Sequence, residues 1–296
     1  MKQHIDGALF KQMVLHGAAA ITLEKQPIND LNVFPVPDGD TGTNMSMTIN
    51  TAAAELRKGE PESVDKAASV TASALLRGAR GNSGVILSLL FRGMSKELKG
   101  RLTADGPALA AALQEGVNAA YSAVMKPTEG TVLTVSRLAA KRAAEAAGEN
   151  DAAEYVLDEA IKAGFEVLPQ TMEMNPVLKK AGVVDAGAKG YLLILTGMLA
   201  AMRGEALPEV GEEAPAAKKA DFGSLANEDI TFAFDTVFIV RKTSAKSLRP
   251  LGEYLGSIGD SLVIGEDDEA FKVHVHTNTP GDALKEAQKY GTLELA

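Results

Sequence analysis

Residues 33–45 read VFPVPDGDTGTNM, and they place two carboxylates, Asp38 and Asp40, on a glycine-punctuated loop just ahead of a helical pattern. The two prolines stiffen the approach because each fixes φ and removes a backbone donor, and the two glycines permit tight turns. Paired oxygen ligands beside a helix N-terminus suit a Mg²⁺-bridged phosphate. A bare Asp-Gly-Asp turn that only caps a helix would look the same. The companion loops downstream favour the phosphate site.

Composition limits the class of protein. The chain has 296 residues, 46% of them hydrophobic, which is enough for one large or two ordinary cores. A net charge of −9 without a compensating basic cluster argues against a nucleic-acid partner. The absence of cysteine excludes a disulfide framework, and no signal core or membrane-spanning stretch is present. We expect a cytoplasmic protein without a transmembrane segment.

The first two thirds of the chain, residues 1–204, read as a succession of helices. In the second of them Met45, Ile49, Ala52 and Leu56 recur on one face. Alanine-rich stretches allow close helix packing, so a mainly α fold, a helical bundle or barrel, follows. The predicted helices span 6–25, 43–58, 62–78, 83–99, 106–125, 131–147, 151–168 and 187–203.

The remainder of the chain differs in pattern. Residues 205–229 are rich in charge, proline and alanine, which is typical of an interdomain linker. In residues 230–296 the hydrophobic period changes to two, and Phe232, Phe234, Phe238 and Val240 are predicted to share one strand face. A small α/β domain follows, and its abrupt end favours truncation of a longer chain. The further predicted elements are a helix at 246–257, strands at 261–265 and 270–277, and a helix after residue 281.

Four short, glycine-bearing polar loops each lead into a helix of the first domain. They are the Asp38/Asp40 loop and the segments 78–84, 127–131 and 182–190. An open-ended helical barrel would gather all four at one rim. Several such loops, one of which carries paired aspartates, are more than bundle connections require.

The loop at 78–84, GARGNSG, offers consecutive backbone donors and the Ser83 hydroxyl to an anion at a helix N-terminus. The alternative is an ordinary N-cap formed by Ser83, which would contribute ~1 kcal/mol. Thr131 in the third loop has the same two alternatives, a cap or a donor to phosphate.

Taken together, the segments DGDTGTNM, GARGNSGVIL, EGT and VVDAGAKG resemble the nucleotide-binding domain related to dihydroxyacetone kinases. More narrowly they resemble the ATP-binding subunit of bacterial fatty acid kinase. The segment KVHVHTN at 272–278 is similar to the middle domain of that subunit, so the resemblance covers nearly the whole chain. It implies an eight-helix barrel followed by a small α/β domain, and no P-loop sequence is present.

The resemblance also implies where ATP and Mg²⁺ bind. Asp38 and Asp40 are expected to ligate magnesium and to carry the phosphoryl-transfer chemistry. Related kinases use a third acid upstream, where this chain reads NDLNV at 29–33. Asn32 is the first candidate for the third ligand, and Asp30 is the second.

Further residues are implied as neighbours of the nucleotide. Asp185 and Gly187 would close over it. The other expected cofactor-binding residues are Asn32, Thr41, Gly42, Thr43, Asn44, Gly81, Asn82, Ser83, Gly84 and Thr131.

The implied reaction passes the γ-phosphoryl of ATP to the carboxylate of a fatty acid, which a separate DegV-type protein holds, and gives an acyl phosphate for phospholipid synthesis. Such catalysis needs positioning and charge neutralisation rather than a protein nucleophile. We expect a homodimer. Two alternatives stay open: a dihydroxyacetone-type small-molecule kinase, which would not need the second domain, and a nucleotide-binding regulatory module without turnover.

His274 and His276 lie two apart on a predicted strand, so both side chains leave the same face. We expect this face, which includes Lys272, to be exposed toward an outside ligand. Asp235 on another strand would complete a zinc site, where the family usually has cysteine. The alternatives are contact with the lipid-carrying partner and a hydrogen-bonded polar surface.

Overall fold

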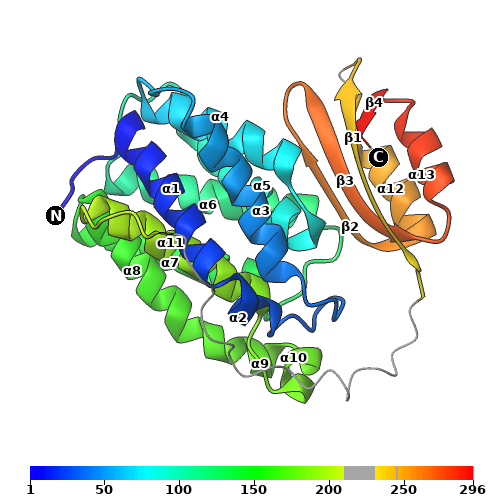
Figure 1. Cartoon of the computed structure of the whole chain (residues 1–296), viewed down its shortest axis with the longest axis horizontal. Helices are drawn as coiled ribbons and strands as arrows, with labels where there is room; N and C mark the ends of the chain where they lie inside the picture. The colour runs from blue at the N-terminus through cyan, green and yellow to red at the C-terminus, as the bar shows by residue number, and fades with distance from the viewer. Residues whose placement is uncertain (210–230, 245, 296) are drawn as a thin grey trace.

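The computed structural model describes residues 1–209, 231–244 and 246–295, so most of the predicted linker at 205–229 lies outside the described residues. In the described part, eight long helices form a closed ring in which each helix packs against the next and the last returns to the first. Figure 1 shows this helical body beside a small sheet. The ring consists of α1 (Gly7–Leu23), α3 (Thr41–Leu56), α4 (Val64–Gly78), α5 (Gly81–Glu97), α6 (Gly106–Ala123), α7 (Val132–Glu149), α8 (Ala153–Val167) and α11 (Ala186–Met202).

The interior of the ring is a continuous hydrophobic core. Phe10, Met45, Phe91 and Leu192, which come from four different helices, are each almost completely buried there. The predicted eight-helix barrel is therefore confirmed. None of the helices in the described ranges is both long and apolar enough to cross a membrane.

Short helical elements between the long ones escaped the sequence analysis. The predicted helix 6–25 ends at Leu23, and α2 begins two residues later. The stretch between α8 and α11, which received no predicted element, contains three short ones. Prolines in the first turns of η1 and α10 preset φ and favour helix starts that hydrophobic periodicity does not reveal. The short elements are α2 (Lys25–Asn29), η1 (Leu168–Gln170), α9 (Thr171–Met174) and α10 (Pro176–Ala181).

Helix direction explains where the predicted loops meet. Consecutive long helices are neighbours in the ring, so their directions alternate, and α3, α5, α7 and α11 run the same way. Their N-termini, which begin at Thr41, Gly81, Val132 and Ala186, therefore lie at one rim of the barrel. Each of the four predicted glycine-bearing loops leads into one of these N-termini.

The second body is a four-stranded antiparallel sheet in the order β2-β3-β1-β4 with two helices. Phe234, Phe238 and Val240 alternate along β1 and share one face, as predicted; Phe238 and Val240 lie in the core, whereas Phe234 at the start of the strand is exposed. The terminal strand was not predicted. The elements are β1 (Phe234–Lys242), α12 (Arg249–Ile258), β2 (Gly259–Glu266), β3 (Ala270–Thr277), α13 (Pro280–Ala287) and β4 (Gly291–Leu295).

The sheet lies between the helical barrel and the helices α12 and α13 (Figure 1). Phe271, Val273 and Val275 of β3 pack into the small core with α12 and α13. The alternate residues of β3 face the barrel instead, and Val263 of the neighbouring strand β2 joins the barrel core. Val124, at the end of α6, forms a β-bridge with Val263. The two bodies therefore share a packed interface.

Candidate active site

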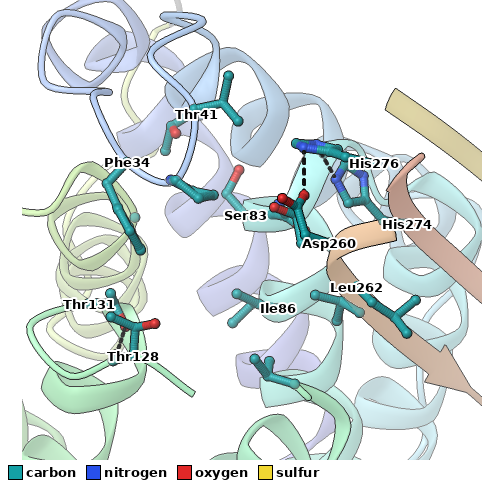
Figure 2. A pocket seen from close by; sticks show the side chains of 18 of the residues that line it. Phe34, Thr41, Ser83, Ile86, Thr128, Thr131, Asp260, Leu262, His274 and His276 are labelled. Carbon is teal, nitrogen blue, oxygen red and sulfur yellow. Dashed lines mark hydrogen bonds and ion pairs between the residues drawn. The ribbon is translucent and has the colours of Figure 1, made fainter. Parts of the chain in front are cut away.

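A cavity of about 400 Å³ lies between the rim of the barrel and the barrel-facing side of the sheet. Figure 2 shows Ser83, Asp260 and the two histidines gathered on one side, with Ile86 and Leu262 below them. The cavity therefore has a polar region and an apolar region. The predicted site residues that line it are Asn32, Asp38, Asp40, Thr41, Asn44, Gly81, Asn82, Ser83, Thr131, Asp185, Gly187, Asp235, His274 and His276.

Three predicted neighbours of the nucleotide are absent from the described lining: Gly42, Thr43 and Gly84. Gly42 lets α3 approach α2, because a Cβ there would lie 2.1 Å from the carbonyl oxygen of Lys25. Thr43 exchanges two hydrogen bonds with the side chain of Asn29. Gly42 and Thr43 therefore hold the start of α3 against α2 and do not face the cavity.

The carboxylates of Asp38 and Asp40 form the acidic corner of the cavity. Partial burial and the adjacent Asp40 carboxylate raise the pKa of Asp38 to about 7. Two acids that repel each other in this way favour a cation between them. The donor set therefore fits Mg²⁺, which prefers carboxylate oxygens and retains several waters.

Asn32 holds the aspartate loop together. Its Oδ1 accepts hydrogen bonds from the Asp40 N–H, the Thr41 N–H and the Thr41 hydroxyl, at 3.1, 2.8 and 2.6 Å. Its Nδ2 donates to the carbonyl of Val36. With three donors on one oxygen, Asn32 has no free lone pair for a metal in this structure. Asp30, the second candidate, is buried but does not line the cavity.

The four helix N-termini at the rim differ in how their N–H groups are satisfied. Thr131 caps α7 through Leu133 N–H, and Asp185 caps α11 through Ala188 N–H. By contrast, the N-cap side chains of α3 and α5 accept no capping hydrogen bond, although Asn32 and Asn29 accept from the Thr41 and Thr43 N–H groups of α3. Ser83 lies inside α5 rather than at its N-cap, so the alternative of a capping Ser83 was wrong. Uncapped N–H groups carry the positive end of the helix dipole, which makes the start of α5 the better anion site.

Asp185 is almost completely buried at the junction of two helices. Burial raises its pKa to about 6, although hydrogen bonds from the Ala188 and Val132 N–H groups oppose the shift. One carboxylate thus ties the start of α11 to the start of α7. It shapes the rim of the cavity and does not belong to the acidic corner.

His274 and His276 lie on the same face of β3, as predicted, with 3.2 Å between their Nε2 atoms. This face is not exposed as expected, since His274 is only 1% exposed beneath the barrel rim. Burial, aided by His276 and by the charge of Lys272, lowers the pKa of His274 to about 3, so its imidazole is neutral. Asp235 lies close by, with Oδ1 3.3 Å from Nδ1 of His274.

The ligand atoms of Asp235, His274 and His276 lie within 4.8 Å of one another, a spacing that a metal ion could bridge. Asp260 of β2 is a fourth member of the cluster, 3.6 Å from Nδ1 of His276 (Figure 2). Burial is the larger cause of a raised pKa at Asp235, and the Asp40 carboxylate adds to it. The acids of the barrel and of the sheet therefore interact across the cavity.

Lys272, two residues before His274, crosses from the sheet to the barrel. Its Nζ donates to the carbonyl oxygens of Arg77, at 3.2 Å, and Ala79. The side chain is only 2% exposed, and burial together with Arg80 lowers its pKa to about 8. It is therefore buried in the interface between the two bodies.

Sequence analysis missed several lining residues. Asp260 had no local signal, because only the pairing of β2 with β3 places it opposite His276. Lys126 follows α6 and is the one lysine or arginine among the described lining residues. Phe34 was quoted within the aspartate loop but received no role. Asp260 and Lys126 lie in stretches without a motif, so only the folded structure shows that they line the cavity.

Comparison with known proteins agrees with this architecture. The crystal structure of dihydroxyacetone kinase from C. freundii, solved in complex with AMP-PNP and Mg²⁺, superposes with a TM-score of 0.50 at 18% identity. The match covers 67% of this chain and 35% of that chain. At this identity the likeness is one of fold, and it defines the helical barrel as that of a dihydroxyacetone kinase-like domain.

Residues 35–200 match the DAK2 domain, and residues 231–295 match the middle domain of FakA-like fatty acid kinase proteins. The chain therefore belongs to the DAK2-domain family, in the group in which that middle domain follows the barrel. Protein YloV of Bacillus subtilis is 41% identical over 98% of this chain, and an uncharacterised protein of Staphylococcus saprophyticus is 40% identical over 99%. The chain spans about half (54%) of the length of each.

Proposed function

We propose that this chain is the ATP-binding, phosphoryl-transferring part of a fatty acid kinase. It would transfer the γ-phosphoryl of Mg-ATP to the carboxylate of a fatty acid held by a DegV-type binding protein, and so produce an acyl phosphate. The observation that carries the proposal is the shared cavity. The acidic corner and the uncapped start of α5 lie on the barrel side, and neutral His274, with His276 beside it, faces them from the sheet.

The barrel side suits the phosphoryl donor. Asp38 and Asp40 would hold Mg²⁺, which neutralises phosphate charge when bound. The N–H groups at the start of α5 and the Ser83 hydroxyl would donate hydrogen bonds to phosphate oxygens. Lys126, at the rim, adds a positive charge to a cavity otherwise dominated by carboxylates. The dihydroxyacetone kinase of similar fold was crystallised with AMP-PNP and Mg²⁺, which supports ATP and magnesium here.

The sheet side suits the acceptor. A carboxylate oxygen of the fatty acid would form a bond to the γ-phosphorus while the bond from that phosphorus to the bridging oxygen breaks, and ADP leaves. A carboxylate carries no proton to remove, so this transfer requires no general base. A neutral imidazole instead offers an N–H donor to an anionic acceptor. Apolar walls such as Ile86 and Leu262 would limit hydrolysis of the acyl phosphate by excluding water.

A small hydroxylated acceptor is the second candidate, as in a dihydroxyacetone-type kinase. One observation favours it: Asp235 lies beside Nδ1 of His274, the pairing found in carboxylate–imidazole general bases. The pKa of His274, lowered to about 3, makes this imidazole a weak proton acceptor. The match of residues 231–295 to the fatty acid kinase middle domain favours the carboxyl acceptor.

The test is a comparison of acceptors. Purified protein with Mg-ATP is incubated with a fatty-acid-loaded DegV-type protein, with dihydroxyacetone, or with no acceptor, and ADP release and hydroxylamine-trapped acyl phosphate are measured. Acyl phosphate only with the loaded carrier supports the proposal. Turnover with dihydroxyacetone alone would select the second candidate, and nucleotide binding without turnover would leave a regulatory module.

A further inference from the structure

The interface between barrel and sheet contains a buried cation that the proposed chemistry does not use. Lys272 projects from β3 into the barrel, where its Nζ contacts two main-chain carbonyls. Among the described residues no carboxylate pairs with it. Its partners, Arg77 and Ala79, are in the last turn of α4 and at its C-cap. The final carbonyls of a helix lack intrahelical donors and carry the negative end of the dipole, so Lys272 caps α4 from the other body.

The chain segment that Lys272 holds leads directly to the nucleotide side of the cavity. Two residues after Ala79 the chain enters α5, and Gly81, Asn82 and Ser83 line the cavity. This turn is tightly fitted, because Gly81 has a φ of +55° and a Cβ there would lie 2.4 Å from Nδ2 of Asn44. A displacement of Ala79 would therefore be transmitted to the N–H groups that face the phosphate.

The same strand carries the groups on the opposite wall of the cavity. Lys272, His274 and His276 alternate along β3, so they share one face and their Cα atoms are about 7 Å apart at each step. A strand paired on both sides is a rigid spacer. The contact of Lys272 with α4 thus fixes the distance between the histidines and the start of α5.

We propose that Lys272 is a positioning residue that sets the sheet-borne histidines in register with the phosphate-binding start of α5. The expected fall in kcat rests on the proposed function. The expected loosening of the start of α5 rests on the observed contacts alone. Loss of the contact loosens the start of α5 and misaligns donor and acceptor, while the metal ligands Asp38 and Asp40, which lie on another loop, stay in place.

The interface also offers a matched control. Arg77 and Glu269 form an ion pair of 2.9 Å across the same two bodies, but both side chains are well exposed. Exposed pairs contribute little, so Glu269→Gln removes an interbody contact without disturbing the buried one. Lys272→Arg retains a cationic donor, whereas Lys272→Met retains the length of the side chain and removes the donor.

The experiment measures two quantities on the full chain. The first is amide hydrogen exchange of residues 80–84, which requires neither an acceptor nor turnover. The second is kcat for acyl phosphate formation together with the Kd for Mg-ATP. For Lys272→Met we expect exchange at least ~10-fold faster and kcat at least ~10-fold lower, with the Kd changed by less than ~3-fold. Lys272→Arg should restore both quantities, and Glu269→Gln should change neither.

Unchanged exchange in Lys272→Met would overturn the proposal, as would faster exchange with normal kcat, because the contact would then be only structural. If the unmodified protein makes no acyl phosphate, the proposed function fails while the exchange measurement still decides whether Lys272 orders the start of α5. If Lys272→Met does not fold by circular dichroism, Lys272→Gln replaces it, because it removes the charge and shortens the side chain that contacts the Arg77 and Ala79 carbonyls while keeping a polar amide. Normal exchange and kcat in that variant would equally refute the proposal.

Discussion

Asp260 of β2 lies opposite His276 of β3, with 3.6 Å between its Oδ1 and Nδ1 of the imidazole. On the other side of β3, the register places Asp235 of β1 opposite the same histidine. His276 is therefore flanked by an acid on each neighbouring strand. Such an arrangement orients the imidazole, since a carboxylate that accepts from one ring nitrogen selects which nitrogen stays available for the cavity.

The histidine cluster should act in transfer rather than in nucleotide binding. We expect the double variant His274→Ala and His276→Ala to keep the Kd for Mg-ATP within ~3-fold but to lower acyl phosphate formation by ~100-fold, because the acceptor is no longer aligned. Calorimetry and hydroxylamine trapping measure the two effects. Full acyl phosphate formation by the variant would remove the cluster from the reaction. Although the comparisons lend no support to zinc, stoichiometric zinc that is lost in the double variant would assign the cluster to a metal.

The aspartate pair should be essential for the metal. Asp38→Asn and Asp40→Asn are each expected to weaken magnesium-dependent ATP binding by at least ~100-fold, since each removes a charged ligand. Without magnesium, Asp38→Asn should unfold no earlier than the unmodified protein, because it relieves the repulsion that raises the pKa of Asp38. Asp268→Asn, at an exposed acid between β2 and β3, is the control. Unaltered Mg-ATP titrations in both variants would sink the metal assignment.

Lys126 should neutralise anionic substrate at the cavity rim. We expect Lys126→Met to raise the KM for ATP or for the loaded carrier by ~10-fold and to reduce the salt dependence of turnover. Lys99→Met is the matched control, because Lys99 is exposed beyond the C-terminal end of α5, opposite the cavity. Equal kinetics for the two variants over a range of salt concentrations would contradict the role.

Asp185 should make stability depend on pH. Its folded-state pKa of about 6 exceeds the ordinary value of 3.8, so the folded state binds the proton more tightly. The stabilising contribution is therefore complete below about pH 4 and is lost as pH rises through about 6. Relative to Asp185→Asn, the unmodified protein should lose ~3 kcal/mol of unfolding free energy between pH 4 and 7, since each of about two pKa units is worth ~1.4 kcal/mol. Urea unfolding at several pH values measures the difference, and parallel curves would refute it.

Local chemistry explains why the barrel and its rim were predictable. Helix periodicity, glycine at tight turns and acids or hydroxyls before helices are short-range signals. These short-range signals located the loops at Asp38, Ser83, Thr131 and Asp185. The prediction that the loops bind magnesium and ATP came from the resemblance to kinase segments. The same signals did not separate a cap from a ligand. Thr131 proved to be a cap and Ser83 did not, because this distinction depends on where the N-cap falls in three dimensions.

The sequence by itself determined the succession of helices, the change to strands after the linker, and the residue types of the candidate site, because each of these depends on neighbours a few positions away. Only the tertiary structure decided that the histidine face is buried against the barrel, that Asp260 lies beside His276, and that Lys272 caps α4. Those relationships join residues as much as 195 positions apart. They arise from strand register and from the packing of two hydrophobic bodies, and neither has a local signature in the chain.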